Sequence, residues 1–119
     1  MHRLLTLYAP PSDPGAFRAY FEGTHLPLVE KLPGLREYTY GFDLAAVDDG
    51  ESPYFCTFAG DFDNARALDA ALASPAGQAV AADVPNYATG GVVLLRYDVR
   101  DAACDRAKPP PQSGHDRAS

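Results

Sequence analysis

Apolar and polar residues recur along the chain with two different periods, and the changes of period predict four strands and two helical stretches. Each expected strand is a short run that is continuously apolar or alternating and is bounded by turn residues. The four runs are Arg3–Tyr8, Leu35–Leu44, Tyr54–Phe62 and Val92–Tyr97. In the second run the aromatic residues fall on alternate positions, which places them on one face of that strand.

The first helical stretch follows Asp13 and Pro14, a typical cap and first-turn pair. Apolar residues then recur every three or four positions, as on one face of a helix. They are Phe17, Tyr20, Phe21, Leu28 and Leu32. Gly23 and Pro27 interrupt this stripe, so we expect a kink near residues 23–27.

The second helical stretch is rich in alanine and is divided in two. Asp63 is the expected cap of its first part, in which Leu68 and Leu72 should point inward. Ser74 and Pro75 start the second part, which should run to about Asp83. The following Val-Pro pair is typical of a helix end.

The resulting order, βαββαβ, predicts an α+β fold of the ferredoxin-like type, with a four-stranded antiparallel sheet. The first and third strands should be central, and both helices should cover one face, because such crossovers are right-handed. Residues 1–100 form the expected domain. Residues 101–119 are polar and contain three consecutive prolines, so we expect a flexible tail.

The strands also place apolar side chains at consecutive positions, which is typical of a sheet covered on both faces. The consecutive pairs are Leu4 and Leu5, Val92 and Val93, and Leu94 and Leu95, with Phe55 and Phe58 close together as well. We therefore expect a homodimer in which two sheets pack face to face. The alternative is a monomer whose tail, residues 101–119, folds over the sheet; its polar composition disfavours this.

Charge and cysteine content limit the classes of partner. Ten Lys and Arg against sixteen Asp and Glu give a net charge of −6, which argues against nucleic acid and against an anionic membrane surface. No apolar run approaches the roughly 18 residues of a membrane span. Cys56 is predicted to be a small buried apolar residue. A disulfide with Cys104 is not expected, and free cysteines suit a cytoplasmic protein.

His25 is the strongest candidate for chemistry. Helical spacing from Phe21 to Leu28 directs it toward the apolar face, where an imidazole could act as a general acid or base. The structural alternative is a histidine that stabilises the kink by bonding a carbonyl freed by Pro27. Asp83 could orient the His25 ring as a carboxylate partner, or it could cap the helix end together with Asn86. His2 and His115, near the chain ends, should be solvated.

Aromatic residues suit the wall of an apolar pocket, and we predict that Tyr38, Phe42 and Tyr87 bind a small apolar or aromatic ligand. The sequence holds no phosphate-binding glycine motif, so no nucleotide or flavin site is predicted. Its three scattered histidines lack the spacing of metal ligands, so neither a metal nor another cofactor is expected. Haem stays open as an alternative, since one histidine suffices to ligate it.

Several segments together resemble the EthD family over residues 3–98. They are Leu4-Leu5-Thr6-Leu7-Tyr8, Asp13 with Phe17 and Tyr20, His25-Leu26-Pro27-Leu28-Val29, Leu32-Pro33-Gly34-Leu35, Ser74-Pro75-Ala76-Gly77-Gln78-Ala79 and Asp83-Val84-Pro85-Asn86-Tyr87-Ala88. The resemblance implies a dimeric α+β barrel, whose relatives include cofactor-independent monooxygenases, polyketide cyclases and isomerases. It also favours a functional His25, through the family's His-x-Pro element.

The expected function is therefore a cofactor-free oxidoreductase of oxidative catabolism or secondary metabolism that acts on a small apolar molecule, with His25 moving a proton. Two alternatives remain at this point. One is a cyclase or isomerase built on the same pocket. The other is a non-catalytic accessory protein that binds a hydrophobic metabolite for a separate oxidase.

Overall fold

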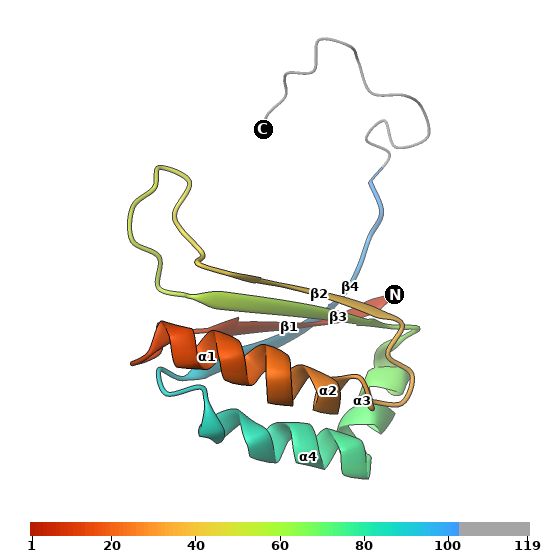
Figure 1. Ribbon diagram of the computed structural model, residues 1–119. Helices are drawn as coiled ribbons and strands as arrows, with labels where there is room; N and C mark the ends of the chain where they lie inside the picture. Colours follow the sequence, from red (N-terminus) through yellow and green to blue (C-terminus); the bar gives the residue numbers. More distant parts are fainter. Residues whose placement is uncertain (103–119) are drawn as a thin grey trace.

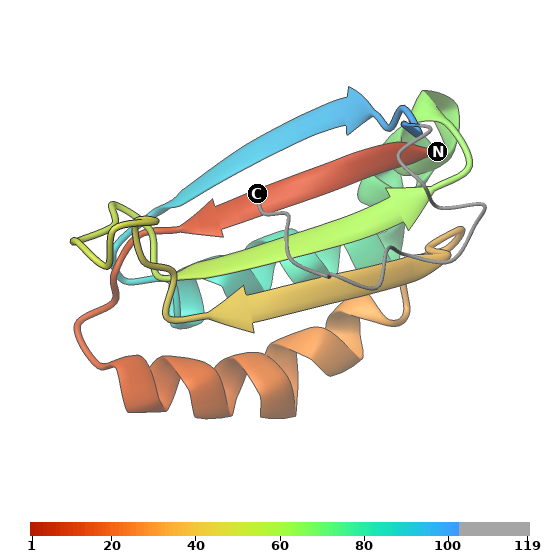
Figure 2. The same cartoon turned by 90° about the horizontal axis from the view of Figure 1, so that it is seen from above.

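The computed structural model describes residues 1–102 and confirms the predicted sheet. Its strands are β1 (His2–Tyr8), β2 (Glu37–Phe42), β3 (Cys56–Phe62) and β4 (Val92–Asp98). All neighbouring strands are antiparallel, in the order β2-β3-β1-β4, so the first and third strands are central (Figure 2). The observed β2 is shorter than the predicted run at both ends, and β3 begins two residues later than predicted.

The helices lie on one face of the sheet, as the crossover rule requires (Figure 1). They are α1 (Pro14–Tyr20), the π-helical segment η1 (Phe21–His25), α2 (Leu26–Val29), α3 (Ala65–Ala73), α4 (Pro75–Asp83) and the 3₁₀ turn η2 (Val84–Asn86). The order of helices and strands is that of the ferredoxin-like fold.

The π segment η1 takes the place of the predicted kink. The N–H of Leu26 bonds the carbonyl of Phe21, five residues earlier, so this turn holds one residue more than an α-helical turn. Pro27 has no N–H to continue an α-helical ladder, which explains why the backbone pattern changes here. The extra residue shifts the register of the helix just before α2. His25 is consequently buried on the side that faces the sheet.

The predicted helix caps are confirmed with one exception. Asp13 accepts a hydrogen bond from the N–H of Ala16, and Ser74 accepts one from the N–H of Gly77. The prediction that Asp63 caps α3 is wrong, because Asn64 accepts the capping bond from Ala67. Asp63 instead receives two hydrogen bonds from the guanidinium of Arg36.

The core lies between the helices and the inner face of the sheet and is largely aromatic. Phe17 and Phe21 are fully buried and contact Tyr8 and Phe42. In α3, Leu68 is fully buried as predicted, whereas Leu72 is 41% exposed. Leu72 is only partly covered because it lies at the wall of a cavity rather than inside the packed core.

The outer face of the sheet is apolar only over its β1–β4 half. Strand register places Leu5 opposite Leu95 and Leu7 opposite Val93 on this face. The β2–β3 half presents Glu37 and Asp61, with threonine, glycine and alanine between. Phe55, expected to help make both faces apolar, is buried and packs against Phe17 on the inner side. The prediction that the sheet is apolar on both faces therefore holds for its β1–β4 half.

The prediction for His2 is wrong, whereas the prediction for Cys56 is confirmed. His2 is 7% exposed rather than solvated, because Asp98 and Arg96 both bond its ring. Cys56 is fully buried, as predicted, and burial raises the pKa of its thiol to about 12. Cys104 and His115 lie outside the described residues, as does all but the start of the predicted tail. No helix within residues 1–102 is long and apolar enough to span a membrane.

Candidate functional site

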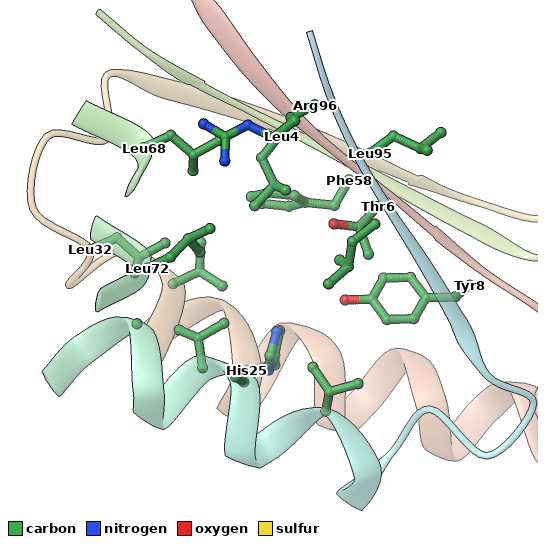
Figure 3. A pocket seen from close by; sticks show the side chains of 16 residues that line it. Leu4, Thr6, Tyr8, His25, Leu32, Phe58, Leu68, Leu72, Leu95 and Arg96 are labelled. Carbon is green, nitrogen blue, oxygen red and sulfur yellow. The ribbon is translucent and has the colours of Figure 1, made fainter. Parts of the chain in front are cut away.

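A cavity of about 200 Å³ separates the inner face of the sheet from α2 and α4 (Figure 3). Its walls are almost entirely aliphatic and aromatic, with a few polar side chains among them. The polar members are Thr6, Tyr8, His25 and Arg96. The volume and the lining suit one small, largely apolar molecule.

His25 projects from the end of η1 into this cavity (Figure 3). The residue is 2% exposed, and its ring packs against Phe21 and Tyr87. Its Nδ1 atom lies 2.9 Å from Oδ2 of Asp83. Within residues 1–102, Nε2 has no hydrogen-bond partner. The geometry leaves Nε2 as the ring atom available to a ligand.

Asp83 is held by three neighbours at once, at the end of α4. Besides His25, the Tyr20 hydroxyl donates a hydrogen bond to Oδ1 at 2.6 Å, and the Asn86 amide donates one at 2.9 Å. Burial by itself raises the pKa of this carboxyl, but the hydrogen bonds outweigh burial and hold the pKa below its ordinary value. Asp83 is therefore ionised at neutral pH and fixed in orientation.

The contact between His25 and Asp83 is the one that the sequence offered as a carboxylate partner for the ring, and Asn86 bonds the same carboxylate. Burial lowers the pKa of His25, and the hydrogen bond and charge of Asp83 only partly offset that effect. The ring is consequently neutral at pH 7. Because the ionised carboxylate only accepts hydrogen bonds, Nδ1 carries the proton and Nε2 presents a lone pair to the cavity. The part of the chain that is described supplies no backbone carbonyl bond to His25.

Tyr8 and Thr6 form the opposite wall of the cavity, on the inner face of β1. The Tyr8 hydroxyl lies 2.7 Å from the Tyr87 hydroxyl. Burial raises the pKa of Tyr8 to about 12, although its hydrogen bond with Tyr87 acts in the opposite direction. Burial raises the pKa of Tyr87 as well. Both phenols are therefore protonated at neutral pH.

Arg96, which the sequence did not single out, lines the end of the cavity near Leu68 (Figure 3). Its guanidinium is held by three acceptors. Nε donates to Nε2 of His2 at 3.0 Å, Nη1 donates to Asp69 at 2.7 Å, and Nη2 donates to the carbonyl of Ala65. The positive charge at this end is thus paired with Asp69.

The three predicted ligand-binding aromatics lie around the cavity rather than in its wall. Tyr38 stacks on Phe58 and donates a hydrogen bond to Glu30, and Phe42 packs into the aromatic core. Neither of them is among the residues that line the cavity. The Tyr87 ring packs against the His25 ring, and the Tyr87 hydroxyl forms a hydrogen bond with the Tyr8 hydroxyl. A direct role of Tyr38, Phe42 and Tyr87 in ligand binding remains a prediction.

Within the described residues, no group of three or more His, Cys, Asp or Glu side chains is positioned to hold an ion. The chemical capacity of the site is proton transfer at His25 Nε2, next to hydroxyl groups and an apolar binding space.

Solved structures below 25% identity show the same fold. A hydroxynitrile lyase from Passiflora edulis superposes with a TM-score of 0.69 at 14% identity, covering 85% of this chain and 94% of the other. A cofactor-independent oxygenase from Streptomyces nogalater gives 0.62 at 16% identity, covering 87% and 96%. A dimeric ferredoxin-like protein from Jannaschia sp. CCS1 gives 0.62 at 20% identity, covering 83% and 100%. These likenesses show that the fold is the ferredoxin-like α+β fold of those structures.

Nearer relatives identify the family. An EthD family protein from Bacillus halodurans C-125 superposes with a TM-score of 0.78 at 28% identity, covering 84% of this chain and 99% of that one. An uncharacterised protein from the thcB–thcC intergenic region of Rhodococcus erythropolis is 34% identical over 98 residues, which are 82% of this chain and 94% of the relative. The EthD domain pattern matches residues 9–91. The chain belongs to the EthD family.

Proposed function

We propose that the protein is a cofactor-free enzyme in which His25, oriented by Asp83, moves a proton on a small, largely apolar substrate. One observation carries this proposal: a buried His–Asp pair presents a free imidazole nitrogen to an apolar cavity. A base that is neutral at pH 7 and lies within reach of a bound molecule meets the requirements of general base catalysis.

The contacts of Asp83 support the role that we propose for it. When Nε2 of His25 takes a proton, the ring becomes an imidazolium with its other N–H bonded to an ionised carboxylate. That charge pair stabilises the imidazolium in a site that is otherwise apolar. Tyr20 and Asn86 support it by fixing the carboxylate, so the ring does not need to reorient during the reaction.

An oxidoreductase is the specific reaction class that we propose, with dioxygen as the oxidant. Deprotonation by His25 gives an electron-rich anion, which can pass one electron to dioxygen without a cofactor. The resulting substrate radical and superoxide combine through a new C–O bond, and the peroxide anion takes the proton back from His25. The substrate is thereby oxidised to a hydroperoxide while dioxygen is reduced to the peroxide level. The fold neighbour named as a cofactor-independent oxygenase supports this class. The neighbour named as a hydroxynitrile lyase equally supports proton transfer without oxidation.

A homodimer is the assembly that we propose for this enzyme. Leu5, Leu7, Val93 and Leu95 form the apolar half of the outer sheet face, and no helix within residues 1–102 covers them. A second copy of the same surface would bury these side chains around a two-fold axis. Similar structures described as dimeric ferredoxin-like proteins support the arrangement. A cytoplasmic location remains a prediction from the sequence.

The test is turnover by the purified protein on a panel of phenols, ketones and cyanohydrins. Oxygen uptake, product formation and exchange of substrate hydrogen in D₂O are followed in parallel. His25→Gln should lower any turnover found by about 100-fold or more, since general base catalysis contributes that much. Full activity in both His25→Gln and His25→Ala would overturn the proposed role.

A pair of alanine variants on α4 tests whether turnover occurs in the cavity. Ala81 lines the cavity, whereas the adjacent exposed Ala82 does not. Ala81→Phe should place a ring in the binding space and reduce both ligand binding and turnover, and Ala82→Phe should change neither. Stoichiometric binding of a panel compound without any turnover would contradict the enzyme and favour the accessory role.

A further inference from the structure

The hydroxyl of Thr6 is a buried polar group without a partner in the described part of the chain. Thr6 is 4% exposed, and no hydrogen bond joins its side chain to residues 1–102. A buried hydroxyl left unpaired costs folding free energy, and the great majority of buried polar groups in native proteins are paired. An exception that lines a cavity points to a ligand that completes the bond.

Tyr8 places a second hydroxyl in the same space. Residues two apart in a strand share a face, so Thr6 and Tyr8 both point from β1 toward the helices. Figure 3 shows the two hydroxyl oxygens directed into the interior that the His25 ring also enters. The cavity therefore has a proton acceptor on its helix side and two hydroxyls on its sheet side.

The hydrogen bond between Tyr8 and Tyr87 leaves one phenolic proton unused. Each phenol carries one proton, and a single bond joins the pair at 2.7 Å. Tyr8 lines the cavity, whereas Tyr87 lies behind His25. If Tyr87 donates to Tyr8, the Tyr8 proton is available to a molecule in the cavity. Thr6 can donate its proton in the same direction.

We infer that Thr6 and Tyr8 donate hydrogen bonds to a carbonyl oxygen of the substrate, and that the substrate is a small, neutral, largely apolar ketone with a hydrogen on the adjacent carbon. This inference rests on the proposed role of His25 and names the class of compound that it acts on. A neutral compound fits better than a carboxylate, because Arg96, the cation at the cavity wall, is already paired with Asp69.

The reaction step follows from this placement. Nε2 of His25 removes a proton from the carbon next to the carbonyl, and the C–H electron pair forms a carbon–carbon double bond. The carbonyl π pair moves onto oxygen, so the product is an enolate beside an imidazolium. Hydrogen bonds from Thr6 and Tyr8 strengthen as negative charge develops on that oxygen. Return of the proton to carbon or oxygen completes an enolisation, which requires no oxidant. The same proton removal is the step that precedes oxidation in the reaction proposed above.

Acetophenone and α-methylstyrene provide a matched pair of probes. They differ in a C=O group against a C=CH₂ group of similar size, so only the ketone offers an oxygen to the two hydroxyls. Dissociation constants for both are measured on the full chain, together with the infrared carbonyl stretch of bound acetophenone. Exchange of the acetophenone methyl hydrogens in D₂O is followed by NMR.

The wild type should bind acetophenone at least fivefold more tightly than α-methylstyrene and should shift the carbonyl stretch to lower frequency. Thr6→Val and Tyr8→Phe should each reduce this preference and the frequency shift, with α-methylstyrene affinity unchanged. Thr6→Ser keeps a hydroxyl and should retain both. Tyr40→Phe is the control and should behave as the wild type, because Tyr40 is a partly exposed residue outside the cavity lining and its hydroxyl donates to Glu22.

The outcomes separate this inference from the proposed function. Equal affinity for the two probes, or a carbonyl stretch that Thr6→Val and Tyr8→Phe leave unchanged, would overturn the inference even if His25 supports turnover of another compound. A carbonyl shift that persists in His25→Gln while hydrogen exchange stops would support both. A persistent shift with unchanged exchange in His25→Gln would support the hydroxyl contacts and contradict the base.

Discussion

The Nδ1 atom of His25 lies 2.9 Å from the Asp83 carboxylate, although 58 residues separate the two in the chain. The pair connects the helical segment after β1 with the one before β4, at the point where both pass the cavity. Tyr20 and Asn86 bond the same carboxylate, so one buried network ties these two segments together.

Replacing Asp83 by Asn should separate catalysis from binding. The amide keeps the shape of the side chain but removes the charge that stabilises a protonated His25. We expect kcat to fall by roughly 100-fold or more, with the dissociation constant of the ligand little changed. Steady-state kinetics and equilibrium binding on the same protein check this. A parallel loss of binding would show that Asp83 shapes the cavity instead.

Acid pH should reduce activity only below the ordinary pKa of histidine. Because burial lowers the pKa of His25, the neutral base persists to below about pH 6.5. The acid limb of kcat/KM should therefore have its midpoint under that value. The charge of Asp83 raises the pKa of His25, so its removal in Asp83→Asn should shift the midpoint of the acid limb to still lower pH.

Stability should follow the same titration. The unfolded chain binds a proton at His25 at a higher pH than the folded chain does, so the contribution of the neutral ring is present above about pH 6.5 and is lost as pH falls through the folded pKa. Urea unfolding across this range, compared between wild type and His25→Gln, measures the contribution. If acidification raised the free energy of unfolding of the wild type relative to that of His25→Gln, the predicted direction of the pH dependence would be wrong.

Thr6→Val should stabilise the protein while it weakens the proposed ketone contact. Valine keeps the branched shape and removes an unpaired buried hydroxyl, so we expect a gain of about 1 kcal/mol in the free energy of unfolding. Urea denaturation measures this gain. Thr6→Ser, which retains the hydroxyl and loses a methyl group, should instead be less stable. A marked loss of stability in Thr6→Val would indicate that the hydroxyl is already paired.

Gly77→Ala should destabilise the contact between α3 and α4. A Cβ at residue 77 would lie 2.2 Å from the carbonyl oxygen of Ala71, which is backbone and cannot move aside cheaply. We expect a loss of about 2 kcal/mol. Gly23→Ala is the matched control, since a Cβ there meets nothing within 4 Å, and it should be neutral or mildly stabilising. Thermal unfolding of the two variants compares them directly.

Val93→Asp should produce a monomer if the outer sheet face pairs two copies. The substitution places a charge in the apolar half of that face, opposite Leu7 and outside the cavity lining, where pairing would bury it. Sedimentation equilibrium at micromolar concentration gives the mass. Ala82→Asp, on the exposed side of α4, should leave the mass unchanged. A wild type that is already monomeric would refute the proposed assembly.

Periodicity predicted the sheet and the helical layer because both depend on which positions are apolar. Capping was harder to assign: Asp63 and Asn64 are adjacent and both are good caps, and the choice depends on Arg36, which bonds Asp63. The exposure of Leu72 was missed for a similar reason. Helical spacing from Leu68 predicts its direction but not the cavity beside it.

Sequence reasoning reached half of the site. His25 stood out because histidine is rare on an apolar helix face. Asp83 had two possible roles, as a partner of His25 or as a cap of the helix end, and the sequence could not give its distance from His25. Thr6 was missed because threonine is an ordinary strand residue, and only its burial without a partner marks it. Arg96 was missed because its contacts with His2 and Asp69 join distant parts of the chain.

The exposure of two cavity residues bears on how molecules reach His25. Leu94 is 62% exposed and Leu72 is 41% exposed, and both belong to the cavity wall. The cavity is therefore open at the β4 edge of the sheet, and no segment within residues 1–102 has to move aside before a molecule enters. A long compound can bind with its reactive end at the imidazole and its remainder outside the protein. The cavity would then select compounds by the part that lies next to the imidazole and would accept many different groups at the protruding end.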